Sequence, residues 1–122
     1  MTKLYSMPEE WVAKLRASRT LDCYPPDEAA ATEIPIAALR PPVIGPQTRG
    51  FDEKRLRDVV DGLLNNSSMP AVVAIYERDG AVLLDGAHRY FACLAAGYRR
   101  IPVLFVPLDI AEAAYGYTQP ES

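Results

Sequence analysis

The chain has 122 residues, a mass of 13.5 kDa and a formal net charge of −3, and 49% of its residues are hydrophobic. This length predicts a single domain, and the apolar content is enough for a hydrophobic core. The acidic balance excludes the overall basic field that nucleic-acid-binding domains carry. The two cysteines and the single histidine, without a Cys-x-x-Cys pattern, are too few for an expected zinc site.

The start of the chain, "MTKLYSMPEEW", lacks the apolar core of a signal peptide, and no run of about 18 apolar residues follows. We therefore expect a cytoplasmic protein with reduced cysteines and no membrane association. Residues 40–100 carry 9 basic and 7 acidic side chains, whereas residues 101–122 carry 0 and 3. Ten of the 13 basic residues are arginines, which suit planar recognition of phosphate or carboxylate.

The first elements in chain order are a helix and a linker. Ser6 and Glu9 fit a capping box, and Trp11 and Leu15 lie one turn apart, so we predict a helix over residues 6–19 that these two side chains anchor. A Pro-interrupted polar stretch follows. Residues 1–32 are thus expected to be an appendage to a domain over residues 33–110, with a C-terminal tail over residues 111–122 that is frayed at its end.

Residues 33–39, "EIPIAAL", predict an edge strand, because Pro35 cannot donate to a sheet ladder. A proline-rich loop follows over residues 40–50. The next element is the clearest helix of the chain, with Asp52 as its N-cap and Phe51 in a hydrophobic staple. Its apolar stripe has helical spacing and consists of Leu56, Val59, Val60, Leu63 and Leu64.

Residues 70–85 predict a β-hairpin, because two apolar runs flank Asp79-Gly80, a pair typical of a two-residue turn. From residue 86 the pattern becomes helical up to Gly97, and a buried strand over residues 99–108 follows. The sequence predicts a buried helix stripe of Phe91, Leu94, Ala95 and Tyr98. Strand, helix and strand predict a β-α-β unit that crosses over to a parallel neighbour. Together these elements predict a small α+β domain with a mixed sheet.

One stretch, "LLDGAHRYFACLAAG" (residues 83–97), predicts a site for an anion. A strand that ends in Asp85-Gly86 and continues directly into a helix presents backbone N–H groups at the helix N-terminus. His88 and Arg89 lie in the first turn, where the helix dipole disfavours cations unless a negative group is bound. Three alternatives stay open: a structural role for His88, pairing of Arg89 with Asp85 or Glu77, and cationic residues in a first turn that binds no ligand. For Asp85 the alternative to a role in the site is that of N-cap.

The stretch "LLDGAHRYFACLAAGYRRIPVLFV" resembles the signature of the ParB/sulfiredoxin superfamily, a Gly-x-His/Arg-Arg box between two strands. Upstream, "IPIAALRPP" and "GPQTRGFDEKRLRDVVDGLLNN" resemble the first strand, loop and helix of the ParB N-terminal domain. The resemblance covers about residues 33–107 and implies the ParB/sulfiredoxin-like fold. It also implies binding of CTP, ATP or ADP, with phosphates held by Gly86, Ala87, His88 and Arg89, and with Gln47, Thr48 and Arg49 in a second contacting loop.

The departures from the family pattern limit what can be transferred. Ala87 stands where sulfiredoxins have their catalytic cysteine, and Cys93 lies in the middle of the helix, so sulfiredoxin activity is not expected and Cys93 is expected to be a buried apolar residue. The helix-turn-helix region of ParB has no counterpart in this acidic sequence, so strong DNA binding is not expected.

Whether the chain is an enzyme stays open. Asp85 matches the acidic residue before Gly-His in the free serine kinases, which implies a phosphotransferase or nucleotide hydrolase that uses Asp85 and Mg²⁺. No metal site whose ligands all come from protein side chains is predicted. The alternatives are a non-catalytic regulatory module with a protein partner, for which Trp11 would mark the docking helix, and a DNA-binding adaptor.

Overall fold

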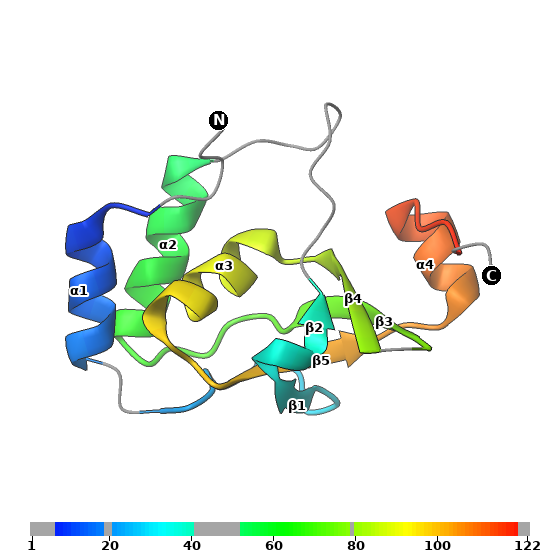
Figure 1. The fold of residues 1–122 in the computed structure, drawn as a ribbon, viewed down its shortest axis with the longest axis horizontal. Coiled ribbons are helices and arrows are strands. Elements are labelled where there is room, and N and C mark those ends of the chain that lie inside the picture. Colours follow the sequence, from blue (N-terminus) through cyan, green and yellow to red (C-terminus); the bar gives the residue numbers. More distant parts are fainter. Residues whose placement is uncertain (1–6, 19–20, 41–51, 79, 120–122) are drawn as a thin grey trace.

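The computed structural model describes residues 7–18, 21–40, 52–78 and 80–119 (Figure 1). Within these ranges the chain forms an α+β domain, as predicted. Its elements, in chain order, are α1 (Glu9–Ser18), β1 (Thr32–Pro35), the 3-10 turn η1 (Ile36–Ala38), β2 (Leu39–Arg40), α2 (Glu53–Leu64), β3 (Val72–Glu77), β4 (Gly80–Asp85), α3 (Ala87–Ala96), β5 (Arg100–Phe105) and α4 (Leu108–Tyr115).

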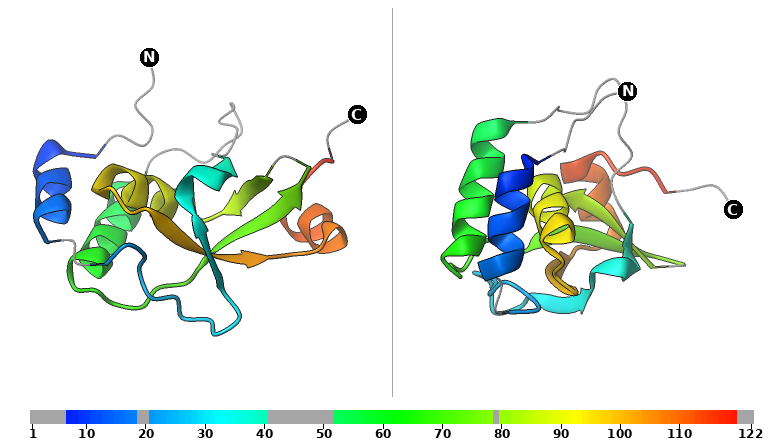
Figure 2. Two further views of the ribbon diagram at one scale, coloured as in Figure 1. Left: turned by 60° about the horizontal axis from the view of Figure 1, so that its bottom comes forward. Right: turned by 60° about the vertical axis from the view of Figure 1, so that its left-hand side comes forward.

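The five strands form one mixed sheet in the order β1-β5-β3-β4-β2. The predicted edge strand over residues 33–39 is in fact two short strands, because η1 interrupts it. β1 pairs with β5 and β2 pairs with β4, so the two strands lie at opposite edges of the sheet. Since only the three residues of η1 separate them in sequence, the sheet has to curl until its edges approach each other (Figure 2).

The predicted hairpin is confirmed as the antiparallel pair of β3 and β4. Glu77 pairs with Gly80, so Gly80 is the first residue of β4 and not part of the turn, in contrast to the prediction. The predicted parallel pairing of the strands before and after α3, which are β4 and β5, is wrong. β5 is parallel to β3, which lies between β5 and β4, and β4 therefore runs opposite to β5.

The helices α1, α2 and α3 gather on one side of the sheet, and α4 lies at its other end (Figures 1 and 2). The Asp52 carboxylate caps α2 by accepting from the Arg55 N–H at 3.1 Å, as predicted. The predicted apolar stripe of α2 also holds, since its members are buried or packed against the core. Phe51 and Ser6 lie outside the described residues.

The predicted buried face of α3 is only partly right. Tyr98 is buried and Phe91 packs against the core, but Ala95 is only half-buried and Leu94 points outward. Leu94 is 47% exposed, whereas Tyr90, Cys93 and Ala96 are buried. Small side chains let a helix approach its neighbours closely, so packing against α2 and the sheet selects the face with Cys93 and the alanines over the face with Leu94. The predicted end of the helix is confirmed, because Gly97 has a φ of +83° and its N–H bonds to the last turn.

The helix α4 was not predicted, and its residues 111–115 fall in the expected tail. Ala111 is buried, and Gly116, at a φ of +66°, ends the helix. Beyond it, the Tyr117 hydroxyl donates to the Glu77 carboxylate, which also pairs with Arg40. These contacts join residues far apart in sequence, which local patterns do not reveal.

The N-terminal part of the chain contributes to the same core as the predicted domain. Leu15 of α1 and Tyr24 are each 2% exposed and belong to the core cluster, and Trp11 packs against it. We call residues 21–31, between α1 and β1, the N-terminal segment. The proposed domain boundaries stay a prediction.

Candidate functional site

Gly86 connects β4 to α3 and shapes the N-terminus of that helix. Its φ is +104°, and as the N-cap residue of α3 it has no side chain with which to cap the helix. The first hydrogen bond of the helix runs from the Tyr90 N–H to the Gly86 carbonyl at 2.9 Å, so the N–H groups of the first turn have no acceptor within the helix. A Cβ at Gly86 would lie 2.7 Å from Val72 Cγ1 and 3.1 Å from Arg89 Nη2, so only glycine fits without a shift.

His88 joins the beginning of α3 to the beginning of α2. The backbone N–H of Asp52 donates to His88 Nε2 at 3.3 Å. A ring nitrogen that accepts a hydrogen bond carries no proton, so His88 is neutral in this arrangement. Two helix N-termini, each with partial positive charge, thus meet around one imidazole, and this makes the region attractive for an anion.

The pKa of the Asp52 carboxyl is lowered, mainly because the Arg55 N–H donates to it. The Arg55 guanidinium adds a smaller electrostatic contribution. A carboxylate at the N-cap therefore balances part of the positive charge of α2, on the side where His88 lies.

Arg89 is directed into the protein rather than toward an acidic side chain. Burial raises the pKa of the Tyr24 hydroxyl, and the positive charge of Arg89 lowers it in part. The proton of that hydroxyl goes to the Pro70 carbonyl at 2.7 Å. Glu77, an alternative partner, is held by Arg40 and Tyr117. The Nε of Arg89 is buried, and no described residue supplies it with an acceptor. A buried donor without a partner costs about 1–3 kcal/mol, and more when it is charged.

Asp85 is the last residue of β4 and its side chain is exposed directly before Gly86. The structure therefore brings Asp85, Gly86, Ala87, His88 and Arg89 together at one corner of the sheet. Gln47, Thr48 and Arg49 lie outside the described residues. Whether any of these residues binds a ligand stays a prediction.

Comparisons with known proteins agree with this architecture. No model of a known protein family matches the chain. It is 29% identical, over 89 residues, to the chromosome-partitioning protein Spo0J of Thermus thermophilus, and the match covers 73% of this chain and 33% of Spo0J.

Two solved structures are also similar. Sulfiredoxin from Arabidopsis thaliana matches with a TM-score of 0.52 and 18% identity, over 62% of this chain and 83% of that one. The C-terminally truncated ParB from Caulobacter crescentus, complexed with CTP-γ-S, matches with a TM-score of 0.52 and 20% identity, over 75% of this chain and 56% of that one. The chain thus has a ParB/sulfiredoxin-like fold.

Two interactions of this ParB/sulfiredoxin-like domain were not predicted as part of the site. Asp52 was recognised as a helix cap, but nothing local indicates that it meets His88, 36 residues later. Tyr24 lies outside the stretch that resembles the family, and its sequence context carries no signal that the charge of Arg89 acts on its hydroxyl.

The two cysteines of the ParB/sulfiredoxin-like domain are free, and burial raises the pKa of both thiols. The pKa of Cys23 is about 11, and Cys93 is fully buried in α3, as expected for an apolar core residue. Neither is a thiolate near neutral pH, so neither is an activated nucleophile. Within the described ranges, no three His, Cys, Asp or Glu side chains gather into a metal site.

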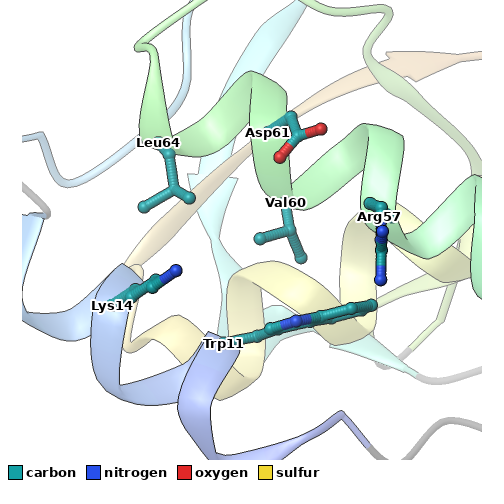
Figure 3. Close-up of a pocket in the computed structure, with 6 residues that line it drawn as sticks. All are labelled: Trp11, Lys14, Arg57, Val60, Asp61 and Leu64. Atoms are coloured by element: carbon teal, nitrogen blue, oxygen red, sulfur yellow. The ribbon is translucent and has the colours of Figure 1, made fainter.

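A groove of about 340 Å³ lies between α1 and α2 of the ParB/sulfiredoxin-like domain (Figure 3). Val60 and Leu64 form its apolar side, and the Arg57 guanidinium lies 5.3 Å from the centre of the Trp11 ring. Its charged residues have both signs, and none of the predicted site residues lines it. Of the helices in the described ranges, none combines the length and apolar composition needed to cross a membrane.

Proposed function

We propose that this ParB/sulfiredoxin-like domain binds a nucleotide through its phosphates at the N-terminus of α3. The observation that carries the proposal is the meeting of two helix N-termini at His88, next to a helix start whose N-cap residue, Gly86, has no side chain to cap it. Backbone N–H groups in this arrangement match the oxygen atoms of a phosphate. The ParB structure that resembles the chain was crystallised with CTP-γ-S, which supports the same ligand class.

In this proposal each candidate site residue contacts a defined part of the nucleotide. Gly86 and Ala87 offer backbone N–H groups to the phosphates, and His88 and Arg89 offer side-chain donors. Gln47, Thr48 and Arg49 contact a further phosphate or the base. The candidate ligands are CTP, ATP and ADP.

Mg²⁺ fits this site as a partner of the nucleotide. The ion prefers few carboxylates and several phosphate or water oxygens, and Asp85 supplies one exposed carboxylate beside the cradle. The ion would neutralise phosphate charge when bound.

A second candidate function is phosphoryl transfer or nucleotide hydrolysis. Asp85 immediately precedes the cradle, so its carboxylate can hold an acceptor hydroxyl or water next to a bound phosphate and take its proton. The remaining candidates are a regulatory module that binds without turnover and a DNA-binding adaptor. Because the chain spans only 33% of Spo0J, that protein's role in chromosome partitioning is not transferred.

Thermal unfolding with CTP, ATP, ADP, GTP and pyrophosphate, each with and without Mg²⁺, tests the proposal. At 100 times its dissociation constant a ligand adds about 2.7 kcal/mol of stability, a Tm increase of several degrees for a domain of this size. We expect Arg89→Ala to remove the increase. Arg78→Ala, an exposed arginine just beyond the far end of β3, is the control that keeps it.

An unchanged Tm with every ligand would overturn nucleotide binding. If binding is found, Mg²⁺-dependent phosphate release that Asp85→Asn abolishes identifies an enzyme. Binding without release identifies a regulatory module. Affinity for duplex DNA that falls steeply with salt would favour the adaptor.

A further inference from the structure

The groove between α1 and α2 contains none of the residues of the predicted phosphate cradle. Two residues of α1, one turn apart, and four residues of α2 line it: Trp11, Lys14, Arg57, Val60, Asp61 and Leu64. Figure 3 shows the Trp11 ring opposite Val60, with the Arg57 guanidinium toward one end of the groove and the Lys14 ammonium toward the other. Because α1 precedes residue 33, one wall of this groove lies outside the stretch that resembles the family.

The wall that α1 forms is held in place by buried and polar contacts. Leu15 is 2% exposed, and Arg16 Nε donates to the Ala95 carbonyl of α3 at 3.0 Å. The N-terminal segment that follows α1 is tied to the stretch before β3, where the Met69 N–H donates to the Pro25 carbonyl at 3.1 Å. The groove is therefore formed before a partner arrives, and this lowers the entropic cost of binding.

An apolar strip runs along the groove. Val60 is buried, whereas Trp11 and Leu64 are only half-buried, so part of each side chain stays open to solvent. Trp11 is the only tryptophan of the chain, and the Arg57 guanidinium lies 5.3 Å from the centre of its ring. Tryptophan and arginine are enriched among the residues that contribute most to binding between proteins. The composition of this strip therefore favours a protein partner.

The charged groups beside the strip are available to such a partner. Among the residues that the structure describes, no ion pair or hydrogen bond involves the side chains of Lys14, Arg57 or Asp61. Two cations and one carboxylate give the groove a positive balance, whereas the whole chain has a net charge of −3. An acidic partner is thus attracted by this groove and not by the protein as a whole, which makes the contact specific.

The spacing of the residues on α2 indicates a partner that is itself helical. Arg57 and Leu64 lie two turns apart, about 10 Å along the helix axis. Lys14 reaches the groove near Leu64, so the two cations are separated by a similar length (Figure 3). A second helix has the same rise per residue, and acidic side chains two turns apart on it match this separation. Asp61 lies between the two cations and disfavours a further acid at the centre.

We propose that the groove between α1 and α2 binds an acidic amphipathic helix of a partner protein. The expected pattern of the partner is Glu-x-x-Leu-Leu-x-x-Glu, in which either acid and any large aliphatic residue can take these positions. The aliphatic pair packs on the apolar strip, and the acids pair with Lys14 and Arg57. The inference goes beyond the proposed function and does not depend on it, because groove and cradle share no residue.

Titration of the full chain with two synthetic peptides tests this inference. Both are Ala-rich, contain no tryptophan and have about four helical turns; one carries the acidic pattern, and the other has Lys in place of both Glu. Since Trp11 is the only tryptophan, its fluorescence reports on the groove directly. We expect a saturable change with the acidic peptide and an affinity about tenfold lower for the basic one, a difference that shrinks as salt is added. Equal affinities, or no saturable change with the acidic peptide, would overturn the inference.

Charge reversal assigns the binding to the groove. Lys14 and Arg57 are exposed, so Lys14→Glu combined with Arg57→Glu should leave the fold intact, which circular dichroism checks. This double variant should prefer the basic peptide. Arg78→Glu, at an exposed arginine just beyond β3, is the matched control and should keep the preference of the wild type. A double variant that still prefers the acidic peptide would overturn the inference, and the two wild-type titrations remain decisive if it does not fold.

A second copy of this chain is the alternative occupant of the groove. Sedimentation velocity at increasing protein concentration tests it without any peptide, and a monomer is the expected result. A dimer that the double variant abolishes would assign the groove to contacts between copies and would overturn the inference.

Discussion

Replacing Gly86 with alanine tests the close approach on which the cradle depends. The φ of +104° disfavours an L residue by about 1–2 kcal/mol. The new Cβ would also lie 2.7 Å from Val72 Cγ1, inside a buried strand, and such overpacking costs about 1–3 kcal/mol. The sum is a loss of about 2–5 kcal/mol. For a domain of this length it lowers the Tm by roughly 6–20 °C.

The chain contains a matched control for this substitution. Gly97 also has a positive φ, of +83°, but a Cβ there would meet nothing within 4 Å. Gly97→Ala should therefore show the conformational part alone, about 1–2 kcal/mol. Urea unfolding followed by circular dichroism gives both free energies of unfolding, and their difference measures the contact between Gly86 and Val72.

Equal losses in the two variants would refute the reasoning, because the close approach would then carry no free energy. A stable Gly86→Ala variant that keeps full affinity for CTP would further show that the backbone at this position does not need to lie close to the ligand.

Three further predictions concern the core, the thiols and the helix cap. Leu15→Ala should lower the free energy of unfolding in urea by about 2–5 kcal/mol, because the Leu15 side chain is only 2% exposed. Leu94→Ala should lower it by less than about 0.5 kcal/mol, because Leu94 is 47% exposed. Similar losses in the two variants would contradict the placement of Leu94 on the exposed face of α3. With a pKa of about 11, Cys23 should react with maleimide about ten times faster for each pH unit between 8 and 10, and a plateau near pH 8.5 would contradict its burial. Because the pKa of Asp52 is lowered in the folded protein, its charge stabilises the fold above its ordinary pKa of 3.8, and this stabilisation disappears as the pH falls below that value. The Tm difference between wild type and Asp52→Asn should shrink in the same range, and a constant difference would show that the charge plays no part.

Much of the local structure could be predicted because its causes lie within a few residues. The cap at Asp52, the apolar stripe of α2, the β3–β4 hairpin and the end of α3 at Gly97 all depend on neighbours in sequence. The Gly-x-His/Arg-Arg box that begins at Gly86 could be recognised because a strand, a glycine and a helix follow each other directly in the sequence.

The errors come from elements whose structure depends on distant segments. Pro35 indicated an edge strand, but only the pairing with β5 and β4 divides that stretch between two opposite edges. The buried face of α3 depends on what packs against it, and α4 is too short and too exposed for its pattern to stand out.

The sequence by itself determined the α+β class, the ParB/sulfiredoxin-like order of elements and the four residues from Gly86 to Arg89 as the candidate cradle, with Asp85 directly before it. Only the tertiary structure decided what these residues touch. His88 accepts from the cap of α2, and the Nε of Arg89 is buried rather than directed toward an acid. The physical reason is that a helix start and its charges are local properties of a chain, whereas the partner of a buried polar group is chosen by packing among segments far apart in sequence.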